Sequence, residues 1–311
     1  MSATESITVL VPDELGAEAL SGIDGVRALV YDATDPDKPL PPGAAEAEVL
    51  VPGFLVETDP AAFVDRLPNL RLIQLTTAGA ENWIGRIPSQ VMLSIARGAH
   101  GGSTAEWALG ALIAVYRELI PFDRLRESRT WDRHATDTLQ DKRVLVLGAG
   151  DLGRRMRTRL EASDATVTLV GTTAREGVHG IDELPALLGQ HDVVVLMVPL
   201  TDATTGLVDA EFLARMPDGA VLVNAARGKV VVTDALLAEL QRGRLRAALD
   251  VTDPEPLPPD HPLWTAPGLL LTPHVAGSVH GYARRAYAVV AAEIARYAAG
   301  KDPENLVHGA Y

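Results

Sequence analysis

Two kinds of hydrophobic pattern alternate along the chain. Short apolar runs rich in Val, Leu and Ile alternate with longer segments in which apolar residues return every three or four positions. The short runs predict buried β-strands, and the longer segments predict amphipathic helices. A chain in which strands and helices alternate builds parallel sheets covered by helices, so the pattern predicts an α/β protein.

The apolar runs fall into two series separated by a helical stretch. The first series predicts strands at Ile7–Val11, Val26–Tyr31, Glu48–Val51, Arg71–Leu75 and Val91–Ile95. The second series predicts strands at Arg143–Leu147, Thr166–Val170, Asp192–Val198, Ala220–Asn224, Ala247–Val251 and Leu269–Thr272. Six strands with helical crossovers complete a doubly wound sheet of the Rossmann type, so the second series predicts a dinucleotide-binding coenzyme domain.

Three helix signals organise the rest of the chain. Ser103 and Glu106 have the S-x-x-E spacing of a capping box, ahead of an apolar helix that we expect to cross between two domains. A second helix is predicted from Thr233, as its N-cap, to Gly243 just past its end. After residue 281, the segment RRAYAVVAAEIARYAAG predicts a final helix that packs back against the first domain.

These signals predict two domains with a discontinuous boundary. Residues 1–102 and 282–311 are expected to form a substrate (lid) domain. Residues 103–281 are expected to form the dinucleotide-binding domain. A chain of 311 residues is long enough for this arrangement.

Composition narrows the classes of function. The formal net charge is −13, which argues against general nucleic-acid binding. Cysteine is absent, which excludes disulfides and thiol chemistry, and no apolar run approaches the roughly 20 residues that span a bilayer. The N-terminal stretch MSATESITVLVPDE has no signal-peptide core. We therefore expect a cytoplasmic protein with neither a membrane nor a nucleic-acid partner.

The segment VLVLGAGDLG is a candidate phosphate-binding loop. Gly148, Gly150 and Gly153 have the G-x-G-x-x-G spacing, with Asp151 and Leu152 between the last two glycines. The loop follows an apolar strand and opens a helix, which is the context that a dinucleotide site requires. The first glycine permits the tight turn, the second admits the pyrophosphate to the backbone, and the third lets the helix approach the strand.

The end of the next strand bears on the choice of cofactor. An NAD site usually has Asp or Glu there to hold the ribose 2′-hydroxyl. This chain instead offers Thr172, Thr173 and Arg175, with no acid before Glu176. Two hydroxyls and a guanidinium suit a 2′-phosphate, so NADP(H) is the predicted preference. If Arg175 is only a solvated loop charge, NAD(H) is the cofactor.

Candidate catalytic groups follow three later strands. VLVNAARGKVV supplies Arg227, and TPHVAG supplies His274. Between them, LDVTDPEPLPPDHPLW holds a group of four acids, namely Asp250, Asp253, Glu255 and Asp260. Ligands of open α/β sheets bind at the carboxyl ends of the strands, so these side chains are predicted to meet there.

With these motifs in place, the sequence resembles the D-isomer-specific 2-hydroxyacid dehydrogenase family. GAGDLG, VPLTDATTGLV, VNAARGKVV, ALDVTDPEPLP-x-DHPLW and TPHVAG occur in family order, and LIQLTTAGAENW and RGAHGGSTAEWALG extend the resemblance into the first third. The resemblance implies a Rossmann coenzyme domain and a smaller flavodoxin-like substrate domain with the cleft between them. It also implies a homodimer joined through the coenzyme domains, with Trp131 in the segment that reaches the partner.

The resemblance assigns roles residue by residue. It places the family's arginine, glutamate and histidine on Arg227, Glu255 and His274. It implies cofactor contacts beyond the glycine loop from Pro199, Thr204, Ala225, Ala226, Asp250 and Gly277, with Asp250 facing the nicotinamide carboxamide. It implies substrate contacts from Phe54, from the backbone N–H groups of Ala78 and Gly79, and from Arg227.

The chemistry explains why these residue types are needed. A 2-oxo acid has an anionic carboxylate beside a ketone, and the planar fork of Arg227 can hold both. The nicotinamide delivers hydride to C2, and the developing alkoxide then needs a proton. His274 can supply that proton because imidazole titrates near neutral pH. Glu255 beside it would favour imidazolium. No metal ion is expected.

Three residues depart from the family pattern. Thr252 stands where an aromatic residue is usual, Asp253 adds an acid beside it, and Asp151 puts a carboxylate inside the phosphate loop. We expect Asp253 and Asp260 to be solvated. The side chain of Asp151 would oppose a bound phosphate unless it is turned away.

Two other functions fit parts of the same pattern. A dehydrogenase of another small anion, such as formate or phosphite, would also use Arg227. A non-catalytic, dinucleotide-sensing binding protein could keep all three catalytic residue types. Turnover of NADPH with glyoxylate separates a reductase from a sensor, and absence of turnover across a panel of 2-oxo acids would rule out the reductase.

Overall fold

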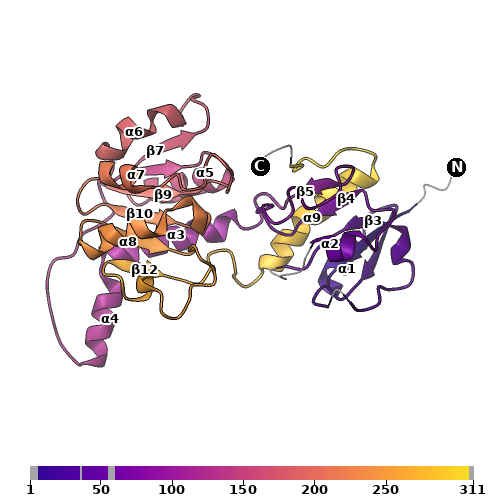
Figure 1. Cartoon of the computed structure of the whole chain (residues 1–311), viewed down its shortest axis with the longest axis horizontal. Coiled ribbons are helices and arrows are strands. Elements are labelled where there is room, and N and C mark those ends of the chain that lie inside the picture. Colours follow the sequence, from indigo (N-terminus) through magenta and orange to yellow (C-terminus); the bar gives the residue numbers. More distant parts are fainter. Residues whose placement is uncertain (1–5, 36, 55–59, 308–311) are drawn as a thin grey trace. The chain divides into compact units, whose positions relative to one another are not determined.

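The chain folds into two compact units. The computed structural model describes residues 6–35, 37–54 and 60–307; residues 1–5, 36, 55–59 and 308–311, which include both ends of the predicted substrate domain, lie outside this description. Unit 1 comprises Met1–His100 and His280–Tyr311, and unit 2 comprises Gly101–Val279. Both are α/β with parallel sheets, as predicted (Figure 1).

The described part of unit 1 forms a five-stranded parallel sheet in the order β2-β1-β3-β4-β5. This is the strand order of flavodoxin-like folds. Its strands are β1 (Ile7–Val11), β2 (Val26–Val30), β3 (Ala47–Leu50), β4 (Leu72–Gln74) and β5 (Met92–Ser94). Each lies where an apolar run predicts one: β1 has the predicted ends, and the ends of the other four differ by at most one residue.

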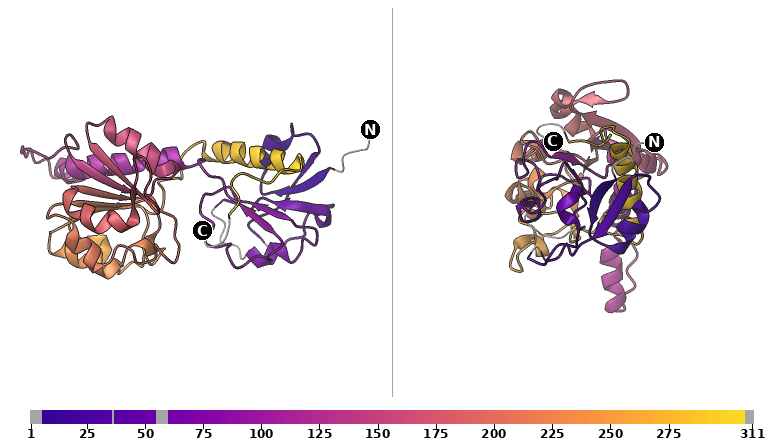
Figure 2. Two further views of the ribbon diagram at one scale, coloured as in Figure 1. Left: turned by 90° about the horizontal axis from the view of Figure 1, so that it is seen from above. Right: turned by 90° about the vertical axis from the view of Figure 1, so that its right-hand side faces the viewer.

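Helices cover both faces of this sheet because side chains alternate along each strand. Val9 and Val11 point to the face covered by Tyr287, Val290 and Ile294 of α9. Figure 2 shows α9 lying along that sheet. Leu10, between the two valines, belongs to the opposite cluster. The helices of unit 1 are α1 (Glu14–Leu20), η1 (Ala44–Glu46), α2 (Pro60–Val64) and α9 (Tyr282–Ala298).

The described residues of unit 2 form a seven-stranded parallel sheet in the order β12-β11-β10-β9-β6-β7-β8. Its strands are β6 (Arg143–Leu147), β7 (Thr166–Gly171), β8 (His179–Gly180), β9 (Val193–Leu196), β10 (Val221–Asn224), β11 (Arg246–Leu249) and β12 (Leu269–Leu271). The prediction of six strands missed β8. This strand has only two residues, His179 and Gly180, and shows no apolar period.

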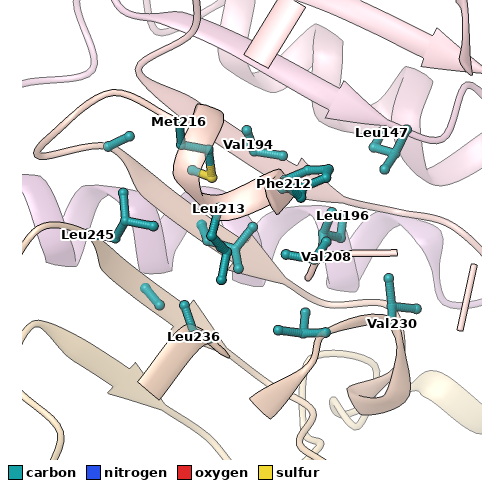
Figure 3. Close-up of a cluster of buried hydrophobic side chains, with 14 of the residues drawn as sticks. Leu147, Val194, Leu196, Val208, Phe212, Leu213, Met216, Val230, Leu236 and Leu245 are labelled. Atoms are coloured by element: carbon teal, nitrogen blue, oxygen red, sulfur yellow. The ribbon is translucent and has the colours of Figure 1, made fainter. Parts of the chain in front are cut away.

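Two apolar layers enclose this sheet. On one face Val194 and Leu196 of β9 pack against Phe212 and Leu213, as Figure 3 shows. On the other face, alternate residues such as Val195 pack against α3 and α5. The helices of unit 2 are α3 (Gly101–Tyr116), α4 (Leu119–Glu127), α5 (Asp151–Glu161), η2 (Ile181–Glu183), α6 (Leu184–Leu187), η3 (Leu188–Gln190), α7 (Ala210–Arg215), η4 (Gly228–Val230), α8 (Thr233–Gln241) and η5 (Pro262–Thr265).

Two predicted helix starts are wrong, and one predicted end is confirmed. Helix α3 begins at Gly101, so Ser103 and Glu106 lie inside the helix and do not form its capping box. Helix α8 has Val232 as its N-cap, and Thr233 is already helical. The Thr233 hydroxyl instead donates to the carbonyl of Asp253. Gly243 follows α8 with φ +65°, as a helix-ending glycine should.

Helix α4 stands apart from the sheet layers of unit 2, from which it projects (Figures 1 and 2). In the described part of the chain, no helix combines the length and the apolar character needed to cross a bilayer.

Candidate active site

The glycine loop lies where the strand order of unit 2 reverses. Chain order runs outward from β6 to β7 and β8, and then returns to β9 on the other side of β6. The loops after β6 and β9 therefore diverge at this point, which is where open α/β sheets bind their ligands. Gly148 follows β6 directly and has φ +113°, a conformation that L side chains avoid.

The three glycines have separate structural reasons. A β-carbon on Gly148 would lie 2.3 Å from the Met197 carbonyl oxygen, and one on Gly153 would lie 1.8 Å from that of Gly148. Among the residues that the structure describes, none comes within 4 Å of the position that a β-carbon of Gly150 would take. The outer glycines are thus required by packing, whereas the middle one faces open space above the N-terminus of α5. This arrangement fits a pyrophosphate.

Asp151, whose carboxylate was expected to oppose a bound phosphate, is the first residue of α5. Its carboxylate accepts from Nε of Arg155, at 2.9 and 3.0 Å. The carboxylate also lies beside Gly101, where a β-carbon would come within 2.2 Å of it. Asp151 is therefore engaged with Arg155 and the start of α3. Leu152 packs into the apolar layer below the loop.

Arg175 lies on a tight turn at the end of β7. Arg175 and Val178 exchange backbone hydrogen bonds of 2.9 Å, and Gly177 between them has φ +70°. The turn brings Nη2 of Arg175 to 3.3 Å from the Ala149 carbonyl, in the glycine loop. Nη1 of Arg154 lies at the same distance from that oxygen. Two guanidinium groups thus flank the loop, and Arg175 also donates to the carbonyl of Thr173, which like Thr172 is an exposed residue.

The loop after β9 is closed by its own threonines. Oγ1 of Thr204 donates to the Pro199 carbonyl at 2.7 Å and accepts from the backbone N–H of Thr201 at 2.8 Å. Both Pro199 and Thr204 were predicted to contact the cofactor. The structure brings them together in one short loop of unit 2.

Arg227 follows β10 in a turn that is organised by Asn224. The Asn224 side chain accepts from the N–H of Ala226 at 3.0 Å and donates to the Arg227 carbonyl at 2.9 Å. Ala225 and Ala226, within this turn, are buried. Gly228 must be glycine, because a β-carbon there would lie 1.8 Å from the Thr252 carbonyl oxygen. The turn of Arg227 is therefore packed directly against the loop that carries Glu255.

His274 and Glu255 are hydrogen-bonded through Nδ1 of the imidazole and Oε1 of the carboxylate. This bond raises the pKa of His274 above its usual value, against an opposing effect of burial and of the Arg227 charge. Burial alone would raise the pKa of Glu255, but the bond and charge of His274, with help from Arg227, hold it below the usual range. Arg227, Glu255 and His274 thus interact electrostatically as one group.

Asp250 holds the loop on which His274 stands. Its carboxylate, in a residue only 2% exposed, accepts from the hydroxyl of Thr272 at 2.6 Å and from the N–H groups of Val275 and Ala276 at 2.9 and 2.8 Å. Its carbonyl also accepts from the N–H of His274 at 2.7 Å.

These bonds offset a local strain. His274 has φ +53°, a left-handed conformation that costs a non-glycine residue about 1–2 kcal/mol. Asp250 was predicted only to face the nicotinamide carboxamide. The structure shows in addition that its carboxylate holds the loop of His274. Gly277 lies three residues beyond His274 in the same turn, and its carbonyl accepts from the N–H of Val279.

The predicted substrate residues Phe54, Ala78 and Gly79 belong to unit 1. Phe54 lies beyond β3, and Ala78 and Gly79 lie in the turn beyond β4, so all three are at the carboxyl end of that sheet. All three are half-buried. The hydroxyl of Thr77 donates to the Gly79 carbonyl at 3.0 Å and closes the turn.

Several residues that shape the site were not predicted. Asn224 and Gly228 shape the turn of Arg227, and Thr272 donates to the carboxylate of Asp250 that holds the loop of His274. A polar residue at the end of each of two apolar strands was the available signal for Asn224 and Thr272. Nothing in the local pattern marks Gly228, since its reason is the approach of Thr252, from another loop.

Comparisons with known proteins agree with this geometry. The family model for the NAD-binding domain of D-isomer specific 2-hydroxyacid dehydrogenases matches residues 109–276. A glyoxylate reductase from Thermofilum pendens is 30% identical over 272 residues, which cover 82% of this chain and 80% of the relative.

Solved structures resemble the whole chain. A D-isomer specific 2-hydroxyacid dehydrogenase from Xanthobacter autotrophicus Py2, in complex with NADPH and MES, has a TM-score of 0.83 at 30% identity and covers 98% of each chain. A family protein from Aeromonas salmonicida has a TM-score of 0.84 at 26% identity, over 98% of this chain and 99% of its own.

Proposed function

Because the chain belongs to the D-isomer-specific 2-hydroxyacid dehydrogenase family, we propose that it is an NADP(H)-preferring reductase of a small 2-oxo acid. Glyoxylate and hydroxypyruvate are the proposed kind of substrate, and the product is the D-2-hydroxy acid. The glyoxylate reductase relative supports this substrate class. The observation that carries the proposal is the hydrogen bond between Glu255 and His274, with Arg227 close enough to influence the pKa of both.

Arg227, Glu255 and His274 have separate roles in the proposed reaction. Arg227 binds the substrate carboxylate and polarises the adjacent ketone through its planar fork. Glu255 holds Nδ1 of His274 and favours the imidazolium, so that Nε2 carries the proton given to the product oxygen. The backbone N–H groups of Ala78 and Gly79 and the ring of Phe54 are proposed to contact the substrate from unit 1. When bound, the dinucleotide supplies the hydride.

The proposed preference for NADP(H) rests on the edge of the glycine loop. Arg175 approaches the Ala149 carbonyl, and Thr172 and Thr173 lie beside it with exposed side chains. This donor set suits a 2′-phosphate. The relative from Xanthobacter autotrophicus Py2 was solved with NADPH. Gly148, Gly150, Leu152, Gly153 and the loop from Pro199 to Thr204 are proposed to hold the rest of the dinucleotide, together with Ala225, Ala226 and Gly277.

A homodimer joined through the coenzyme units is also proposed. The support is a group of exposed apolar side chains on α4 and the segment after it. Leu119 is 50% exposed, Ile120 47% and Trp131 94%. Exposed apolar side chains on a projecting segment suit a protein–protein contact.

The test is turnover of NADPH with glyoxylate, hydroxypyruvate and pyruvate across a range of pH. We expect kcat/KM to fall as pH rises through the pKa of His274, because the proton donor is lost. Glu255→Gln removes the group that raises this pKa, so the fall should begin at lower pH, by on the order of one unit. Asp260→Asn, which changes an exposed acid of the same loop, is the control and should leave the profile in place. Absence of turnover across the panel would rule out the reductase.

A further inference from the structure

Three aromatic rings meet at the carboxyl end of the sheet in unit 1, and one of them is Phe54, a proposed substrate contact. The rings of Phe54 and His100 stack with centroids 5.5 Å apart and planes 28° apart. The ring of Tyr282 lies 4.3 Å from Phe54 and 6.4 Å from His100, at similarly small angles. The cluster draws one residue from each of three separate segments, and all three are half-buried.

His100 also makes a polar contact with the turn that carries Ala78 and Gly79. Its Nε2 lies 2.9 Å from the Thr76 carbonyl oxygen. A carbonyl oxygen only accepts, so Nε2 is the protonated ring nitrogen in this bond. One face of the imidazole is thus held by stacking while its edge holds the backbone of the turn.

The anchored carbonyls determine where the N–H groups of the turn point. A peptide unit is planar, so fixing a carbonyl oxygen also fixes the N–H of the next residue on the opposite side. His100 anchors the carbonyl of Thr76, and the N–H of Ala96 anchors that of Thr77 at 2.8 Å. Two consecutive peptide planes at the entry of the turn are therefore held, which orients the N–H of Thr77 and of Ala78.

We propose that His100, held by Phe54 and Tyr282, is a positioning residue for the substrate-carboxylate turn Thr76–Gly79. The inference rests on the proposed function, because that function makes this turn the carboxylate contact of unit 1. It adds that part of the affinity for the 2-oxo acid depends on a histidine that takes no part in proton transfer.

Two variants separate the two parts of this arrangement. His100→Phe keeps a ring for stacking and removes the donor to Thr76. His100→Gln keeps an N–H donor and removes the ring. Steady-state kinetics with glyoxylate, the Kd of NADPH by fluorescence, and amide hydrogen exchange of the peptide containing residues 75–80 are measured for both variants and for the unaltered protein.

We expect His100→Phe to raise KM for glyoxylate about 3- to 10-fold, which is the effect of one lost neutral hydrogen bond. Exchange of the turn amides should become faster, while kcat and NADPH affinity stay near those of the unaltered protein. His100→Gln should recover part of the KM. A merely structural role would instead lower kcat and NADPH affinity together with substrate affinity.

The outcomes distinguish this inference from the proposed function. An unchanged KM in His100→Phe, or unchanged exchange of residues 75–80, overturns the positioning role while leaving the reductase intact. Absence of turnover in the unaltered protein overturns both.

Discussion

The loop of His274 and the turn of Arg175 are held in opposite ways. Three donors at 2.6–2.9 Å surround the buried carboxylate of Asp250 and hold His274 in a strained conformation. Arg175 is exposed and reaches the glycine loop through a bond of 3.3 Å. The loop of the proposed proton donor is thus held by several hydrogen bonds to one buried carboxylate. The proposed choice of cofactor rests on an exposed side chain that could change at little cost to stability.

The largest effect should come from Arg227→Ala, which tests whether the group formed by Arg227, Glu255 and His274 carries out the reaction. Removing a preorganised cationic donor should lower kcat/KM for the 2-oxo acid by about 10²- to 10³-fold. The Kd of NADPH should stay nearly constant, because the glycine loop and the Arg175 turn are untouched. Arg242→Ala, an exposed arginine after α8, is the matched control. Unchanged activity in Arg227→Ala would remove this residue from the site.

Arg175→Ala tests the exposed turn that is proposed to select the cofactor, and it should have an intermediate effect. Loss of hydrogen bonds to a charged phosphate should lower kcat/KM for NADPH by about 10- to 100-fold. The value for NADH should hardly change, because no 2′-phosphate is present. Arg215→Ala, in an exposed ion pair with Glu211 on α7, provides the control. A parallel loss with both cofactors would contradict the proposed phosphate contact.

Thr272→Val gives the smallest expected effect and sharpens the role of Asp250. The variant removes one of the three donors to that carboxylate, so kcat should fall about 3- to 10-fold while NADPH affinity is kept. Thr272→Ser retains the hydroxyl and should remain close to the unaltered protein. Loss of NADPH affinity without loss of kcat would instead mean that Asp250 acts mainly on the cofactor.

The strand pattern was readable from the sequence wherever a strand is long and apolar. β1 and β6 have the predicted ends, since four of the five residues of each are buried and most are apolar. β8 was not predicted, because its two residues gain their strand geometry by pairing with β7. The misplaced start of α3 has a similar cause. A capping box is a local signal, and here the chain is already helical before it.

The candidate site divides in the same way. Its residue types and their order were visible, because each follows an apolar strand whose end is marked by polar residues or glycine. The partners of Asp250 were not visible, since Thr272, Val275 and Ala276 lie 22, 25 and 26 positions away. For the same reason the sequence left all four acids of its proline-rich loop as candidates until the family resemblance favoured Glu255.

The sequence by itself determined the α/β class, the two series of strands, the glycine loop and the chemistry available at the strand ends. These follow from local periods and from the properties of single side chains. Only the tertiary structure decided which groups hold one another. It paired Glu255 with His274, and it brought the backbone of the His274 loop to the carboxylate of Asp250. It also stacked His100 on Phe54 beneath a turn that neither residue adjoins in sequence. Such contacts form because parallel strands bring their carboxyl ends to one edge of a sheet, however far apart those ends lie along the chain.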